Sequence, residues 1–126
     1  MNCKTIYIEP MGKPRMTQRD KWLTPPRDCV KRYRRYSDAI KKAMKGVDLD
    51  DVYCVSWTCY LPIPKSWSKK KKAAMAGAYH KQKPDRDNID KGILDSLFKD
   101  DSGVCAGVLR KYWDDGQGAR IELRWI

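Results

Sequence analysis

Residues 83–101 read KPDRDNIDKGILDSLFKDD and contain six of the sixteen acidic residues of the chain, all of them Asp. Ile89, Ile93 and Leu97 recur at every fourth position, which predicts a helix that begins near residue 87 or 88, ends near residue 98 and turns these three side chains inward. Asp is a poor helix former, so its density around one helix requires a reason other than folding.

The segments around this helix predict a sheet. Runs rich in Val, Ile, Tyr, Trp and Thr indicate strands, which we expect at residues 5–8, 51–61, 104–113 and 120–126. The last of these has the alternation of a strand with one face in the core and the other half-exposed. Its inward residues are Ile121, Leu123 and Trp125, and its half-exposed residues are Arg120, Glu122 and Arg124.

Two further helices are predicted. One runs from Asp28 as its N-cap to about Lys45, and the other, capped by Ser66 or Ser68, holds residues 69–72 and the Ala-rich segment behind them. In the first helix, apolar residues near one stripe form the expected buried face, namely Val30, Tyr33, Ile40 and Met44. The sequence therefore predicts a single α+β domain over residues 1–126, with a mainly antiparallel or mixed sheet and helices packed on one side.

The composition favours a polyanionic partner. The chain carries 27 Lys and Arg against 16 Asp and Glu, a formal net charge of +11. Nucleic acid, an anionic membrane and a merely soluble charged surface are the candidates that explain this excess. No run of about 18 apolar residues is present, so no membrane span is expected. The N-terminal residues lack the apolar core of a signal peptide, and we therefore expect a cytoplasmic protein.

The five cysteines are expected to be free thiols that serve packing. The sequence has no C-x-x-C pair, and His80 is its single histidine, so a zinc site would lack ligands at a suitable spacing. We interpret His80 as an exposed residue without a role as a general base.

The acidic stretch suits a hard divalent cation. Asp85 and Asp87 are two positions apart, so in an extended segment both carboxylates point to the same side, and Lys91 and Asp95 follow Asp87 along one helical face. Carboxylates without His or Cys are the ligands that Mg²⁺ and Mn²⁺ prefer, and Lys91 could stabilise a phosphate transition state. Helix caps and turns also explain each Asp separately, so a purely structural interpretation stays open.

Positive charge is concentrated in the first 45 residues, which hold 13 Lys and Arg and 4 acidic residues. Such cations bind DNA phosphates and release counterions, which makes the affinity sensitive to salt. The four-lysine run at residues 69–72 adds a second patch, although a solvated helix surface explains it equally well. The candidate DNA-binding residues are Lys13, Arg15, Arg19, Lys21, Lys31, Arg34, Arg35, Lys69 and Lys70.

The stretch from Lys83 to Leu97 resembles the core motif of the RusA family of Holliday-junction resolvases, in outline K-P-D-x-D-N-x-x-K-x-x-x-D-x-L. The Asp100-Asp101 pair is similar to a second motif of that family, and residues 12–15 (GKPR) resemble a segment near its N-terminus. Many fixed residue types at fixed spacing make this match specific. One departure is the short connection before the Asp pair, which leaves open whether Asp100 or Asp101 occupies the family position.

The resemblance implies a homodimeric, Mg²⁺-dependent endonuclease that resolves four-way DNA junctions in recombination and repair, with Mn²⁺ able to substitute and no small-molecule cofactor. It implies that Asp85, Asp87 and Asp101 are metal-binding catalytic carboxylates and that Lys91 is the catalytic lysine. The supporting positions are Asn88, Asp95 and Asp100. A bacterial, phage or prophage setting is expected for such a resolvase.

Two other functions are compatible with parts of the sequence. A basic nucleic-acid-binding module without catalysis explains the charge, but it leaves six Asp residues in one segment as a source of repulsion. A Mg²⁺ nuclease built on a D…E-x-K core would have to use residues 122–124 (ELR), which lack the lysine. A cleavage assay with and without Mg²⁺ separates the binding module from an endonuclease.

Overall fold

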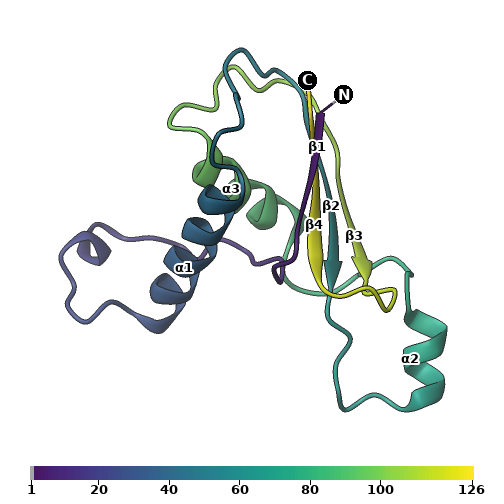
Figure 1. Cartoon of the computed structure of the whole chain (residues 1–126). Coiled ribbons are helices and arrows are strands. Elements are labelled where there is room, and N and C mark those ends of the chain that lie inside the picture. The colour runs from purple at the N-terminus through teal and green to yellow at the C-terminus, as the bar shows by residue number, and fades with distance from the viewer. Residues whose placement is uncertain (1) are drawn as a thin grey trace.

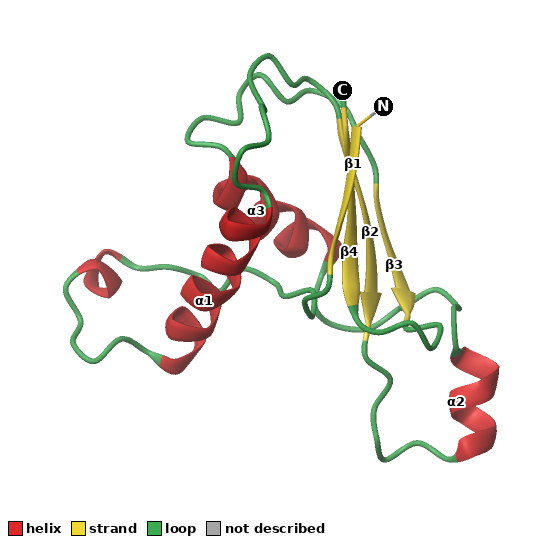
Figure 2. Ribbon diagram, viewed as in Figure 1, coloured by secondary structure: helices red, strands yellow, loops and turns green. Residues whose placement is uncertain are grey.

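The structure is a computed structural model that describes residues 2–126. These residues form one mixed sheet, with helices α1 and α3 on one of its faces (Figures 1 and 2). In chain order the elements are β1 (Asn2–Ile6), the 3₁₀ helix η1 (Gln18–Lys21), α1 (Asp28–Ala43), β2 (Val55–Leu61), α2 (Lys69–Met75), α3 (Arg86–Leu97), β3 (Leu109–Trp113) and β4 (Arg120–Trp125). The expected α+β class, mixed sheet and one-sided helices are confirmed.

The strand order of the sheet is β1-β4-β2-β3. β4 pairs antiparallel with both β1 and β2, whereas β2 and β3 are parallel. Parallel neighbours require a long connection, and here the segment between β2 and β3 contains α2 and α3. Figure 1 shows the two ends of the chain side by side at one end of the sheet, where Asn2 pairs with Trp125.

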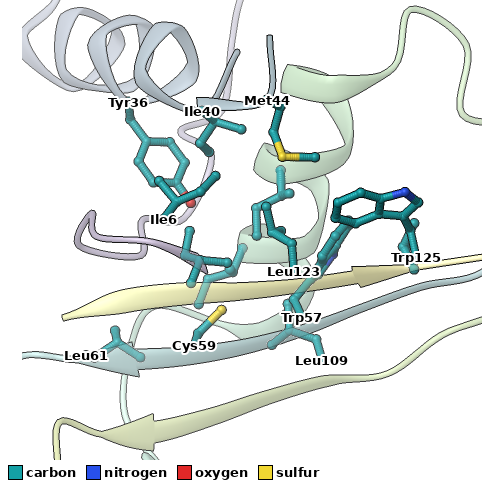
Figure 3. Close-up of a cluster of buried hydrophobic side chains, with 14 of the residues drawn as sticks. Ile6, Tyr36, Ile40, Met44, Trp57, Cys59, Leu61, Leu109, Leu123 and Trp125 are labelled. Carbon is teal, nitrogen blue, oxygen red and sulfur yellow. The ribbon is translucent and has the colours of Figure 1, made fainter. Parts of the chain in front are cut away.

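The core lies between the sheet and the pair α1 and α3 (Figure 3). Ile89 and Ile93 of α3 are completely buried, as expected, and Leu97 packs partly buried against the same cluster. The Tyr33 hydroxyl of α1 donates to the Gly92 carbonyl of α3 at 2.9 Å. A Cβ at position 92 would lie 3.3 Å from the Tyr33 ring, so the small residue allows this close approach. The contact fixes which face of α3 points away from the core.

The expected buried stripe of α1 is confirmed, because all four of its residues are buried: Val30, Tyr33, Ile40 and Met44. The prediction that Asp28 is the N-cap was wrong, since Arg27 occupies the N-cap position and Asp28 is the first helical residue. Ser68 caps α2, as one of the two alternatives predicted. No helix within residues 2–126 is long and apolar enough to cross a membrane.

Two strands begin later than expected, at Val55 in β2 and at Leu109 in β3. Asp51 has a φ of 60°, which belongs to a turn and not to a strand. Gly107 has a φ of 140°, and a Cβ there would lie 1.5 Å from the carbonyl oxygen of Val55. The close approach of residue 107 to β2 therefore requires glycine. Regular strand geometry in β3 begins only after this residue, at Leu109.

The outer strand β1 is displaced from the expected residues 5–8, because its pairing with β4 begins at Asn2 and ends at Ile6. In β4 the expected half-exposed Arg120 is instead 3% exposed. Its guanidinium donates to both carboxylate oxygens of Asp115, at 3.0 and 3.1 Å, so the buried charge is paired. Alternation along the strand could not predict this partner, which lies in the preceding turn.

His80 is buried, with 6% exposure, which corrects the expectation of an exposed residue. Its ring packs against the indole of Trp113, with centroids 4.1 Å apart. All five cysteines are free, as expected. Cys59 is buried in the core, and burial raises the pKa of its thiol to about 12, which leaves it protonated and unreactive at neutral pH.

Candidate active site

Asp85 occupies the N-cap position of α3 but does not cap the helix. Its backbone is extended (φ −66°, ψ 144°), and its carboxylate accepts no hydrogen bond from the first turn. The Lys83 ammonium lies 3.2 Å from it in an ion pair whose Asp85 side chain is 51% exposed. Exposed ion pairs of this kind hold a side chain only weakly, so the Asp85 carboxylate is accessible to a ligand.

Lys111 of β3 holds the chain immediately before Asp85. Its Nζ donates to the carbonyl oxygens of Gln82 and Pro84, each at 2.6 Å. Burial lowers the pKa of Lys111, and the negative charge of Asp85 opposes that shift. The sheet therefore fixes the backbone that brings Asp85 to the start of α3. Sequence reasoning missed Lys111, because a lysine within a strand carries no signal of a partner 27 residues away.

A pocket of about 450 Å³ lies between α3 and residues 104–109. Its two acidic lining residues are Asp87 and Asp90, and Arg86 lies beside them. The indole N–H of Trp57 donates to the Asp90 carboxylate at 2.6 Å, which ties Asp90 to β2. Asp87 is exposed and accepts a bond from the backbone N–H of the next residue at 3.0 Å. Of the two carboxylates, Asp87 is thus the freer to bind a ligand.

A second hollow, a groove of about 390 Å³, separates α3 from the loop that precedes η1. Asn88 and Lys91 line it from α3, and Lys13 and Arg15 line it from the loop. The Lys13 backbone N–H donates to the Asn88 carbonyl at 3.1 Å, which ties the loop to the helix. The structure therefore brings together residues that were expected to serve catalysis, support and DNA binding.

Asp87 lies between the pocket and the groove, because about 100° of rotation per residue places it between Asp90 and Lys91 around α3. Lys91 is exposed and forms no ion pair with Asp87 or any other acid within residues 2–126. The ordinary i,i+4 ion pair, which was the structural alternative for Lys91, is not formed. Asp95 instead pairs with the ammonium of Lys13.

Asp100 and Asp101 follow α3 in a turn. The Asp100 carboxylate accepts the Ser102 backbone N–H at 3.0 Å, and this bond lowers the pKa of Asp100. Asp101 is exposed. Within the part of the chain that the structure describes, no three Asp, Glu, His or Cys side chains lie close enough together to hold one metal ion. Asp101 therefore does not join Asp85 and Asp87 in one cluster here.

The expected DNA-binding residues are spread over several elements. Lys13 is half-buried and paired with Asp95, so its charge is already used within the chain. Arg34 donates to the Asp20 carbonyl at 3.2 Å and so contacts η1. The exposed members of the set are Arg15, Arg19, Lys21, Lys31, Arg34, Arg35, Lys69 and Lys70. Figure 1 shows that α2, which carries the last two, lies at the opposite end of the molecule from the η1 loop.

A family model described as endodeoxyribonuclease RusA matches residues 7–124 of the 126-residue chain. The chain belongs to the RusA family. RusA membership makes it an endodeoxyribonuclease, and the activity that the family implies is Holliday-junction resolution in DNA recombination and repair. The resemblance identified from residues 83–101 is therefore confirmed. A search of curated proteins returned no match for the chain.

The roles of individual residues in this RusA-family nuclease stay predictions, because the family match assigns none of them. The donor chemistry around α3 fits Mg²⁺, which is usually held by one or two carboxylates, with waters and substrate phosphates filling the remaining positions. Asp85 and Asp87 are exposed carboxylates of this kind on either side of Arg86. A cage of three acidic side chains is not needed for such a site.

Proposed function

We propose that this RusA-family chain is a Mg²⁺-dependent endonuclease that resolves four-way DNA junctions by two symmetric cuts, acting as a homodimer. The observation that carries the proposal is the position of Asp87 on the exposed face of α3, between an acidic pocket and a groove that contains Lys91. The helix α3 therefore carries, side by side, carboxylates that can bind a cation and the ammonium of Lys91, which can bind a phosphate.

Each residue of this face has a distinct role in the proposal. Asp85 and Asp87 hold the cation, which in such sites activates a water and neutralises charge on a phosphate. Lys91 stabilises the negative charge that develops on the phosphate during cleavage. Asn88 and Lys13, joined by a backbone hydrogen bond, keep the wall of the groove in place. Asp101, at the start of the turn that its carbonyl closes with the Val104 N–H, is the third proposed carboxylate.

The basic surface provides affinity for the branched substrate, whereas the α3 site provides the cut. The exposed cations of η1 and α1 lie far from those of α2, so a long or branched DNA can contact more of them than a short duplex can. Because these contacts release counterions, the affinity is expected to fall steeply as salt is raised.

The experiment that tests the function compares a mobile four-way junction with a linear duplex of the same length, each incubated with the purified protein in Mg²⁺ or in EDTA. We expect paired cuts in the junction with Mg²⁺, little cutting of the duplex, and binding without cleavage in EDTA. Equal cleavage of both substrates at matched salt would contradict junction selectivity. Binding without cleavage under every metal condition would instead support a non-catalytic DNA-binding module.

A further inference from the structure

A third hollow, distinct from the pocket and the groove of the candidate active site, lies next to that site and has a volume of about 390 Å³. Basic side chains line it, and it is called the basic pocket below. Lys81 comes from the loop before α3, Arg86 from α3 itself, and Arg110 and Lys111 from β3. Its lining contains no carboxylate. Four cations around one hollow repel one another, and an anion bound there would relieve that repulsion.

Three of these cations are unpaired within the chain. Lys81, Arg86 and Arg110 are exposed, and none of them forms an ion pair within residues 2–126. The fourth, Lys111, is half-buried and is fixed by the two carbonyl oxygens that it contacts. The pocket therefore combines one positioned ammonium with three side chains that are free to close on a ligand.

One buried polar atom without a partner among the described residues also belongs to the lining of the pocket. His80 is among the lining residues and is 6% exposed, and its Nδ1 has no hydrogen-bond partner in the part of the chain that the structure describes. Buried polar atoms are usually paired. Tyr79 adds an exposed aromatic ring at the rim, with its other face stacked on Tyr112. A phosphate oxygen can accept a hydrogen bond from His80 when Nδ1 carries the ring proton, which an apolar ligand cannot do.

The basic pocket is continuous with the acidic one. Arg86, Val108 and Leu109 line both hollows, so the two share one side, and Arg86 lies beside both Asp87 and the other cations. Two adjacent sites of opposite charge match a DNA strand whose cut phosphate lies at the acidic site with its cation. The next phosphates along the strand then need a positive environment without a metal ion.

We propose that the pocket formed by Lys81, Arg86, Arg110 and Lys111 binds a backbone phosphate of the substrate DNA strand next to the one that is cut. The proposal rests on the proposed function for the identity of the substrate, and it goes beyond that function by assigning a phosphate site to residues outside the basic N-terminal region. Bound there, the phosphate sets which linkage of the strand reaches Asp87.

The test measures DNA binding in EDTA, so that it does not depend on cleavage. The variants are Arg110→Gln and Lys81→Gln. The control is Lys45→Gln, because Lys45 is an exposed cation just beyond α1 and outside both pockets. Each pocket variant should weaken junction binding about five- to tenfold and reduce the slope of log affinity against log salt by about one. Circular dichroism checks that the variants are folded.

A second arm identifies the bound phosphate. Junctions are prepared with one neutral methylphosphonate at each successive linkage around the cut site, and their affinities for wild type and variants are compared. We expect one linkage at which neutralisation weakens wild type and Lys45→Gln but has no further effect on Arg110→Gln. Penalties that are equal for wild type and Arg110→Gln at every linkage would overturn the proposal, as would pocket variants that bind like the control.

The two proposals fail in different ways. If the wild-type protein binds junctions but never cuts them, the proposed function is wrong, and the coupling between Arg110 and one linkage can still be measured. If cleavage proceeds normally but no linkage is coupled to Arg110, the phosphate pocket is wrong and the nuclease assignment stands. Binding of free inorganic phosphate that does not compete with the junction would also count against the pocket.

Discussion

The acidic residues of the motif differ in what already occupies their carboxylates. Asp90 accepts a hydrogen bond from the indole N–H of Trp57, and Asp100 accepts one from the backbone N–H of Ser102. Asp95 forms an ion pair with Lys13. Asp85 forms an exposed ion pair with Lys83, and Asp87 accepts only the backbone N–H of Asn88. Asp101 is exposed. The metal-binding roles that the family resemblance assigns to Asp85, Asp87 and Asp101 stay predictions, and of these three Asp87 is the one that lines a pocket.

Replacement of Asp87 by Asn should abolish cleavage and retain junction binding. Asn keeps the shape of the side chain but removes the anionic ligand, so we expect the cleavage rate to fall by more than about a hundredfold. Affinity should be unchanged or higher, because one negative charge beside the DNA is lost. Single-turnover cleavage and gel-shift assays measure both effects. Asp38→Asn, on the exposed surface of α1, is the matched control, and loss of folding in Asp87→Asn would show that Asp87 is structural.

Replacement of Lys91 by Ala should slow cleavage far more than it weakens binding. One cation of the 27 Lys and Arg contributes little to total affinity, whereas an ammonium at the reacting phosphate is worth roughly 10²–10³ in rate. Single-turnover rates at saturating protein isolate the chemical step from binding. A Lys91→Ala protein with a near-normal rate would reduce Lys91 to a surface cation.

The motif predicted which residues lie together on α3, because the spacing of its residues follows the helical repeat. It could not predict the partners that come from elsewhere in the chain. Trp57 reaches Asp90 from β2, and Lys111 reaches Pro84 from β3. Such contacts depend on how the sheet is ordered, and a local pattern contains no information on that order.

Among the elements, the parallel pair β2 and β3 depends on one glycine. Gly107 → Ala should destabilise the fold by more than about 3 kcal/mol, because the new Cβ would overlap the Val55 carbonyl and the φ of 140° is strained for any other residue. Thermal unfolding measures the loss. Gly103→Ala is the control, since its added Cβ would meet no atom within 4 Å and its φ is not positive. Equal melting temperatures for the two variants would contradict this account of β3.

The loop between β1 and α1 is organised by a single carboxylate. Asp20 is buried, and it accepts bonds from the backbone N–H of Thr17 at 2.7 Å and from the Arg27 guanidinium at 2.8 and 2.9 Å. The bonds to Arg27 and Thr17 hold the pKa of Asp20 well below its usual range. The sequence showed a long loop with Pro and Gly, but nothing in it identified Asp20 as the centre.

Stability should therefore depend on pH through Asp20. A depressed folded-state pKa stabilises the fold fully above the unfolded value near pH 4, and the stabilisation is lost as the pH falls through the folded value. Wild type should melt at a higher temperature than Asp20→Asn at pH 7, and the gap should narrow between about pH 4 and pH 2. A gap that is constant over that interval would show that the Asp20 charge does not matter.

For the whole molecule, the proposed working unit is a two-fold dimer. Each chain carries the motif once and so offers one cutting centre, whereas resolution of a four-way junction requires two cuts, which a closed two-fold dimer supplies at a fixed separation. In mixtures of wild type with an excess of Asp85→Asn, we expect junctions cut on one strand only to accumulate. Gel analysis distinguishes these nicked junctions from resolved duplexes.

The control for the mixing experiment is an equal excess of Asp38→Asn, which should leave paired cutting intact. A monomeric mass by light scattering at the working concentration, together with paired cuts, would contradict the dimer. The strand face that carries Ile121, Leu123 and Trp125 is buried in the core of one chain, so a partner must bind elsewhere.

The strand order has a consequence for how the chain acquires its fold during synthesis. β4 (Arg120–Trp125) lies between β1 and β2, which do not pair with each other. Until these late residues leave the ribosome, β1 has no neighbouring strand. The edge of β2 that later pairs with β4 is also unpaired. Contacts between residues so distant in sequence form slowly. The nascent protein therefore exposes open strand edges, which favour association with other chains, until translation of this segment is complete.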